Sequence, residues 1–132
     1  MASQPWRRGE MTGMQRAAPA ADAPVFDAAA LDGLRAAFGA RIGVLLDRTR
    51  AVIGERVAQM APLAGEGPSR ALGRLAHEVG GMAGQVGLAR LGAAALALEA
   101  LCEAGGAPEA VRDAADALAA LSALSLEALP SA

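Results

Sequence analysis

The sequence predicts an all-α protein: an antiparallel up-down-up-down four-helix bundle with a short additional N-terminal helix. The first observation is composition, because 54% of the residues are hydrophobic but only 2% are aromatic. Leucine, valine, isoleucine, methionine and alanine must therefore build the core, and leucine and alanine favour helix. The second observation is a series of amphipathic segments with the 3.6-residue period of a helix. The third is that short connections join them, as in antiparallel bundles.

The first 24 residues, 1–24, are expected to form a disordered leader, and residues 25–132 to form the bundle domain. The leader contains Trp6 and a pair of arginines, but no hydrophobic segment follows them as it does in a secretion signal. No apolar run reaches the roughly 18 residues of a membrane span. Cys102 is the only cysteine and cannot form an internal disulfide. We therefore expect a cytoplasmic protein that does not enter a membrane.

A short first helix is predicted from Asp27 to about Gly39. Asp27 is a residue type that caps helix N-termini, and Phe26 and Leu31 have the spacing of a hydrophobic staple. One side of this helix is expected to carry the apolar residues Leu31, Leu34 and Phe38.

The second predicted helix covers residues 41–63 and is amphipathic along its whole length. The segment AGEGP ends it, and Pro68 suits the first turn of the next helix. Its core candidates are Ile42, Leu45, Leu46, Thr49, Val52, Ile53, Val57 and Met60. Its solvent-facing candidates are Arg41, Asp47, Arg48, Arg50 and Glu55.

The third predicted helix, residues 68–86, carries the only histidine of the chain, His77. Its apolar stripe consists of Leu72, Leu75, Ala76, Val79, Met82, Ala83 and Val86. At about 100° per residue, His77 lies roughly 200° from Leu75 and roughly 160° from Val79. His77 is therefore predicted to point away from the core.

The last two predicted helices cover residues 88–106, closed by two glycines, and residues 109–129. Gly87 marks the break before the first of them, and Pro108 opens the second. The core candidates are Leu88, Leu91, Ala95, Leu98 and Cys102 on the first, and Val111, Leu118, Leu121 and Leu124 on the second.

The helix face around His77 is rich in glycine. Each glycine inside a helix costs about 0.5–1 kcal/mol relative to alanine, and a solvated face seldom carries several without a function. We expect the missing side chains to leave a bare surface against which another protein can dock. The residues predicted to share this face are Arg70, Gly73, Arg74, Gly80, Gly81 and Gly84.

This region resembles the motif of histidine-containing phosphotransfer (HPt) domains. That family carries A-H-x-L-K-G, then a further glycine and leucine, and then a Leu-Glu pair on the next helix. The present sequence has Ala76-His77-Glu78-Val79-Gly80-Gly81, then Gly87, Leu91 and Leu98-Glu99. The resemblance spans residues 26–129. It departs from the family at Gly80, where a lysine usually neighbours the phosphoryl group, and the chain contains no lysine.

The resemblance implies a phosphorelay intermediate of a two-component pathway. His77 would accept a phosphoryl group, on Nε2, from a receiver-domain aspartate and pass it to another receiver. Gly81, with Gly80 and Gly84 beside it, would let the receiver approach. Arg74, with Arg70 one turn further back, would replace the missing lysine.

No metal or cofactor of its own is implied, because the receiver brings Mg²⁺. The partners would be receiver domains of response regulators and of hybrid histidine kinases, bound by a monomer. The chain is thus expected to be a non-hydrolytic phosphocarrier and not an enzyme.

Three other functions stay open on the sequence. A degenerate HPt-like module would bind or sequester receivers without carrying phosphate, and an unrelated helical adaptor or homodimer would not bind receivers. A hydrolase is disfavoured, because His77 is the only candidate base and no nucleophile motif accompanies it. The net charge of -2 argues against nucleic acid as a partner, and one histidine with one cysteine cannot make a structural zinc site.

Overall fold

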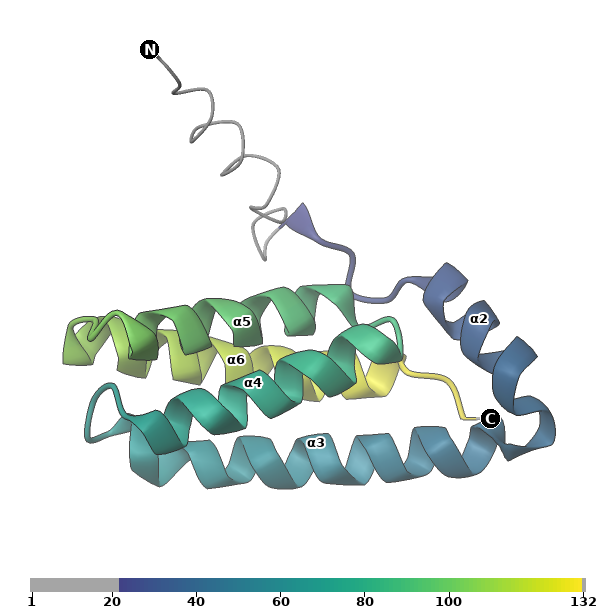
Figure 1. The fold of residues 1–132 in the computed structure, drawn as a ribbon, viewed down its shortest axis with the longest axis horizontal. Coiled ribbons are helices and arrows are strands. Elements are labelled where there is room, and N and C mark those ends of the chain that lie inside the picture. The colour runs from purple at the N-terminus through teal and green to yellow at the C-terminus, as the bar shows by residue number, and fades with distance from the viewer. Residues whose placement is uncertain (1–21, 132) are drawn as a thin grey trace, which may run out of the picture.

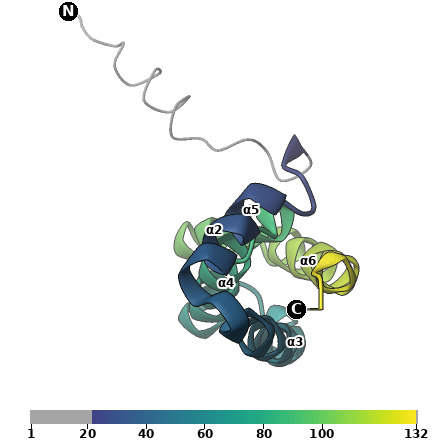
Figure 2. The same cartoon turned by 90° about the vertical axis from the view of Figure 1, so that its right-hand side faces the viewer.

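The computed structural model describes residues 22–131, in which all regular structure is helical. The elements are α2 (Ala28–Phe38), a 3₁₀ turn η2 (Gly39–Arg41), α3 (Ile42–Ala64), α4 (Arg70–Gln85), α5 (Ala89–Glu103) and α6 (Pro108–Ala128). Helices α3 to α6 run alternately up and down in one bundle, and α2 crosses one end of it (Figures 1 and 2). The predicted architecture, a four-helix bundle with a short N-terminal helix, is confirmed.

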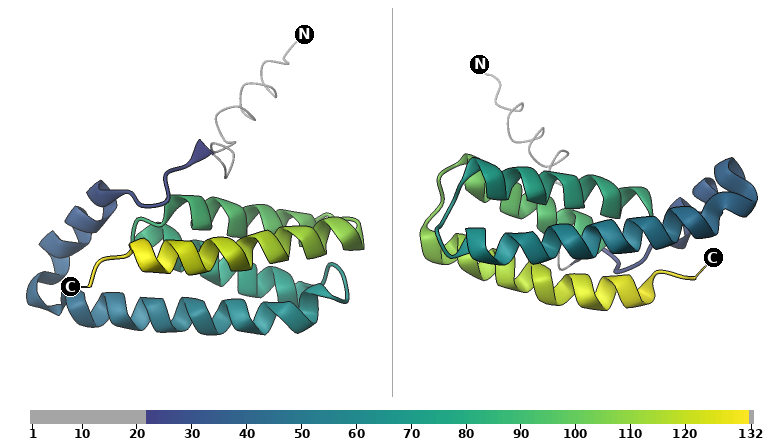
Figure 3. Two further views of the ribbon diagram at one scale, coloured as in Figure 1. Left: turned by 180° about the vertical axis from the view of Figure 1, so that it is seen from behind. Right: turned by 90° about the horizontal axis from the view of Figure 1, so that it is seen from below.

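Each bundle helix packs against two neighbours. Helix α4 lies between α3 and α5, and α6 closes the bundle by packing against both α5 and α3 (Figure 3). None of the helices described for residues 22–131 is long and apolar enough to cross a membrane.

The start of α2 is capped as its sequence predicts. The Asp27 side chain accepts a hydrogen bond of 3.1 Å from the backbone N–H two residues on, and Leu31 is buried with Phe26 packed against the core. Leu34 is partly buried against the core, whereas Phe38 is 38% exposed. Phe38 is the last residue of α2, and the chain turns away at Gly39, which has a φ of 56°.

Helix α4 begins two residues later than predicted. The Ser69 hydroxyl accepts a hydrogen bond of 3.1 Å from the backbone N–H of Leu72, so Ser69 is the N-cap and Arg70 the first helical residue. Pro68 therefore lies before the cap and not in the first turn. Pro108, by contrast, occupies the first turn of α6 as predicted.

The core on α3, α4 and α5 follows the predicted stripes except at Cys102, which is only partly buried, whereas the core on α6 departs from its predicted stripe. The expectation that Leu124 is buried is wrong, since it is 53% exposed, and Leu121 is only partly buried. The positions that face the bundle recur at three- and four-residue intervals from Val111, and that line continues through two serines. The buried residues of α6 are Val111, Ala115, Leu118, Ser122 and Ser125.

The segment before α2 is hydrogen-bonded to the loop between α4 and α5 and to the first turn of α5. Arg90 donates through its backbone N–H to the carbonyl of Pro24 and through Nε to that of Ala23, each at 2.8 Å. Asp27 N–H donates to the Gly87 carbonyl at 2.6 Å. Gly87 has a φ of 88°, and a Cβ there would lie 2.5 Å from the Asp27 carbonyl oxygen, so only glycine fits.

These contacts correct the expected domain boundary. Ala23 and Pro24 were assigned to the disordered leader of residues 1–24, but both hydrogen-bond to α5 and Ala23 is buried. The rest of that leader, residues 1–21 with Trp6, lies outside the described residues.

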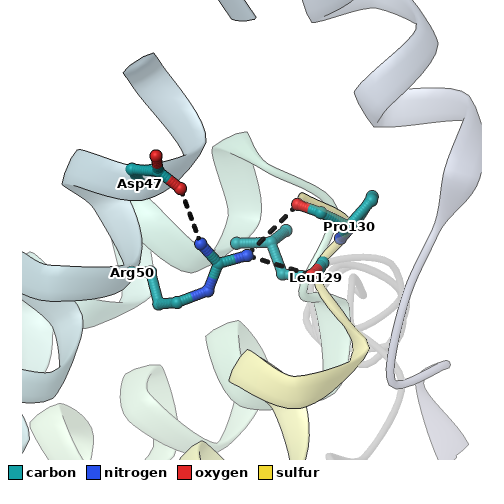
Figure 4. A network of polar contacts seen from close by, with 4 residues as sticks. All are labelled: Asp47, Arg50, Leu129 and Pro130. Carbon is teal, nitrogen blue, oxygen red and sulfur yellow. Dashed lines mark hydrogen bonds and ion pairs between the residues drawn. The ribbon is translucent and has the colours of Figure 1, made fainter. Parts of the chain in front are cut away.

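The end of α6 is tied to α3 by Arg50 (Figure 4). Its Nη2 donates to the carbonyls of Leu129, at 3.0 Å, and Pro130, at 3.1 Å, and its Nη1 pairs with Asp47 at 3.0 Å. Arg50 was expected on the solvent side, but its side chain is only 31% exposed. These two carbonyls follow the last residue of α6, Ala128, and the Arg50 side chain supplies a hydrogen-bond donor to each of them.

Replacing Arg50 with glutamine is expected to lower the free energy of unfolding by about 1 kcal/mol. A hydrogen bond with a charged partner contributes about 1.5–3 kcal/mol, and partial exposure of the guanidinium reduces this. Urea denaturation followed by circular dichroism measures the change. Arg48→Gln, at an exposed position on the same helix, is the matched control. Equal denaturation midpoints for the two variants would rule out a stabilising role for the contact.

Candidate functional site

His77 lies on the outer face of α4, where 69% of its side chain is exposed. The apolar residues on the opposite side of the helix, Leu72, Ala76, Val79 and Ala83, are buried. The predicted orientation of His77, away from the core, is therefore confirmed.

The imidazole is paired with Glu99 of the neighbouring helix α5. Nδ1 of His77 lies 3.1 Å from both carboxylate oxygens of Glu99, whose side chain is only 21% exposed. A carboxylate accepts hydrogen bonds, so this geometry assigns the proton of a neutral imidazole to Nδ1. The lone pair available for chemistry is then on Nε2.

Sequence reasoning did not count Glu99 among the site residues, although the spacing contains the signal. His77 and Glu99 each lie eleven positions from Leu88, in the loop that joins α4 to α5. In an antiparallel helix pair with a short loop, residues equally far from the loop lie at the same level. Their spacing along the chain thus places a carboxylate beside the histidine.

Two of the predicted surface glycines, Gly73 and Gly80, are instead buried against α5. A Cβ at Gly73 would lie 3.3 Å from the Cys102 Cβ, and a Cβ at Gly80 would lie 3.1 Å from Leu96 Cδ2. At about 100° per residue, these two glycines are rotated about 40–60° from His77, toward α5. Their assignment to an open docking surface is therefore wrong: their role is close helix packing.

The other two glycines, Gly81 and Gly84, are exposed as predicted. A Cβ at either position would meet no atom within 4 Å. The helix surface beside His77 is thus open over these residues, on the side facing solvent.

His77 stands between two grooves. The α4–α5 groove, of about 620 Å³, is lined by Ser69, Arg70, Gly73, Arg74, His77, Glu99, Cys102 and Glu103. The α3–α4 groove, of about 700 Å³, is lined by Val52, Arg56, His77, Glu78, Gly81, Met82, Gly84 and Gln85. The structure therefore brings Arg70 and Arg74 into one groove with His77 and Glu99, as the sequence predicts for the arginines.

Cys102 was expected to be buried, but it is only partly buried and lines the α4–α5 groove. The residue opposite it, Gly73, has no side chain with which to cover it. Within residues 22–131, no cluster of three or more histidine, cysteine, aspartate or glutamate side chains could hold a metal ion.

Comparison with protein families identifies the bundle. The family model of the Hpt domain matches residues 44–129, which include all of α4 and α5 and therefore His77, Glu99 and both grooves. Comparisons with curated proteins and with solved structures gave no significant match. Hpt domains are phosphocarriers of two-component signalling that interact with receiver domains, and they are not hydrolytic enzymes. With the match covering nearly the whole bundle, the chain belongs to the Hpt domain family.

Proposed function

We propose that this protein is a phosphorelay intermediate that accepts a phosphoryl group on His77 from a receiver-domain aspartate and passes it to another receiver. The observation that carries the proposal is the pairing of an exposed imidazole with Glu99 through Nδ1, at 3.1 Å. This pairing supports Nε2 as the nucleophile. Because Nε2 needs no further base for attack, the chain can act as a carrier with one functional histidine.

In the transfer step, the Nε2 lone pair attacks the phosphorus of the partner's aspartyl phosphate. The N–P bond forms as the bond from phosphorus to the aspartate oxygen breaks, and the aspartate leaves as a carboxylate with the bonding electron pair. The ring then carries the proton on Nδ1 and a positive charge, which the Glu99 carboxylate stabilises. In the second transfer, an aspartate carboxylate of another receiver attacks the phosphorus. The N–P bond breaks, and its electron pair stays on Nε2 and restores the neutral imidazole.

The surroundings of His77 suit this exchange. Gly81 and Gly84 leave the surface open for a receiver, and Arg70 and Arg74 line the α4–α5 groove with His77. We propose these arginines as the neighbours of the phosphoryl group, because arginine–phosphate contacts are charge-assisted. The proposed partners are receiver domains of response regulators and hybrid histidine kinases, met in the cytoplasm by a monomer.

One observation favours a second candidate function, a degenerate module that binds receivers without carrying phosphate. Position 80, where the family usually has a lysine, is a glycine packed against Leu96. The two candidates differ in one product, an acid-labile and base-stable phosphate on His77. A wild-type protein that binds phosphorylated receivers but never gains this label is the degenerate module.

His77→Gln is expected to abolish labelling by a phosphorylated receiver while leaving the fold intact. The side chain is 69% exposed, and substitutions at such positions change the free energy of unfolding by no more than about 0.5 kcal/mol. Glu99→Ala should still be labelled, but several-fold more slowly, because the positive charge that forms on the ring loses the carboxylate that stabilises it. Autoradiography of label on this chain, with urea denaturation alongside, measures both effects. Persistent label on His77→Gln would place the acceptor elsewhere.

Gly81→Arg is expected to block transfer, because the added side chain projects from the open surface where the receiver docks. The matched control is Gly33→Arg, since Gly33 is also an exposed helical glycine with no atom within 4 Å of a Cβ, but lies on α2. Transfer rates and receiver binding are measured for both variants. Normal transfer by Gly81→Arg would mean that the receiver uses another face.

Arg74→Ala is expected to slow transfer or shorten the phosphohistidine lifetime about two- to fivefold. This corresponds to the loss of about 0.5–1 kcal/mol from an exposed charge-assisted contact. Arg112→Ala, on α6 and outside both grooves, should match the wild type. If Arg74→Ala also matches the wild type in rate and lifetime, Arg74 has no contact with the phosphoryl group.

A further inference from the structure

A third arginine, Arg56 of α3, lies on the other side of His77 from Arg70 and Arg74. Its Nε is 2.8 Å from Oε1 of Glu78, and its Nη1 is 3.4 Å from Oε1 of Glu55. Glu78 directly follows His77 on α4, and both line the α3–α4 groove with Arg56. An ion pair between α3 and α4 therefore lies next to the proposed phosphoacceptor.

This ion pair is partly withdrawn from water. The Arg56 side chain is 32% exposed and that of Glu78 is 40% exposed, whereas Glu55 is 66% exposed. Charges that are partly desolvated attract and repel nearby groups more strongly than charges on the open surface, because the effective dielectric constant around them is lower. The net charge of Arg56 and Glu78 therefore attracts or repels charged groups that enter the α3–α4 groove.

Each of the two grooves is lined by equal numbers of positively and negatively charged side chains. The α4–α5 groove contains two arginines and two glutamates, and the α3–α4 groove contains Arg56 and Glu78 as its charged residues. Without Arg56, Glu78 would be an uncompensated carboxylate. A phosphoryl group on His77 would then have a carboxylate on each side, Glu78 in one groove and Glu99 in the other, and like charges repel it.

We propose that Arg56 is a positioning residue for phosphoryl transfer, which neutralises Glu78 so that the α3–α4 side of His77 admits an anionic phosphoryl group. The inference rests on the function proposed above and extends it to a residue outside α4. Arg56 acts through Glu78, and its own contact with the phosphoryl group is not required. The charge of Glu78, and not the mechanical link between α3 and α4, is what Arg56 controls.

Three variants of the full chain separate these roles: Arg56→Gln, Glu78→Gln and the double variant. Labelling of His77 is measured with two donors, a phosphorylated receiver and the small anionic donor phosphoramidate. We expect Arg56→Gln to be labelled about three- to tenfold more slowly, and Glu78→Gln to match or exceed the wild type. The double variant should return to within about twofold of the wild type, because it removes both charges.

Two further measurements exclude a purely structural effect. The defect of Arg56→Gln should shrink when the salt concentration is raised, since a repulsive charge is screened. Arg56→Lys, which keeps the charge, should be labelled at close to the wild-type rate.

The possible results have distinct meanings. Equal slowing by Arg56→Gln and Glu78→Gln, with no recovery in the double variant, would overturn the inference in favour of a structural ion pair. Wild-type rates for Arg56→Gln would also overturn it while leaving the proposed function intact. A wild-type protein that neither donor labels would refute the proposed function and this inference together.

Discussion

The close approach of α4 and α5 is the constraint on which the site depends. Glycines on α4 permit it: a Cβ at Gly80 would lie 3.1 Å from Leu96 Cδ2, and one at Gly73 would lie 3.3 Å from the Cys102 Cβ. Each glycine weakens its own helix. The gain is a contact between helices close enough for a carboxylate on α5 to reach the imidazole of His77 on α4.

The register of that contact is set at the loop between the two helices. Gly87 turns the chain with a φ of 88°, and its carbonyl is held by the backbone of Asp27. Arg90, in the first turn of α5, is bonded to the segment that precedes α2. Because a shift of one residue rotates a helical side chain by about 100°, this loop decides whether Glu99 meets His77. The contacts that fasten the N-terminal segment therefore support the site from a distance.

In the function proposed above, His77 carries the phosphoryl group on one ring nitrogen. His77 has its Nδ1 engaged by Glu99, so the imidazole offers one nitrogen for attack. Under the proposed function, the arginines and carboxylates of both adjoining grooves would set the charge that an incoming phosphoryl group meets. This arrangement agrees with membership of the Hpt domain family, whose members are phosphocarriers.

The sequence by itself determined the helices, the N-cap at Asp27, the position of Pro108 in a first helical turn, the break at Gly87 and the outward orientation of His77. These features depend on local periodicity and on backbone preferences, which neighbouring residues in the chain decide. Only the tertiary structure decided that Gly80 is buried, that Leu124 is exposed and that Glu99 pairs with His77. Periodicity defines the faces of a helix, but the packing and register of the neighbouring helices decide which of those faces is covered.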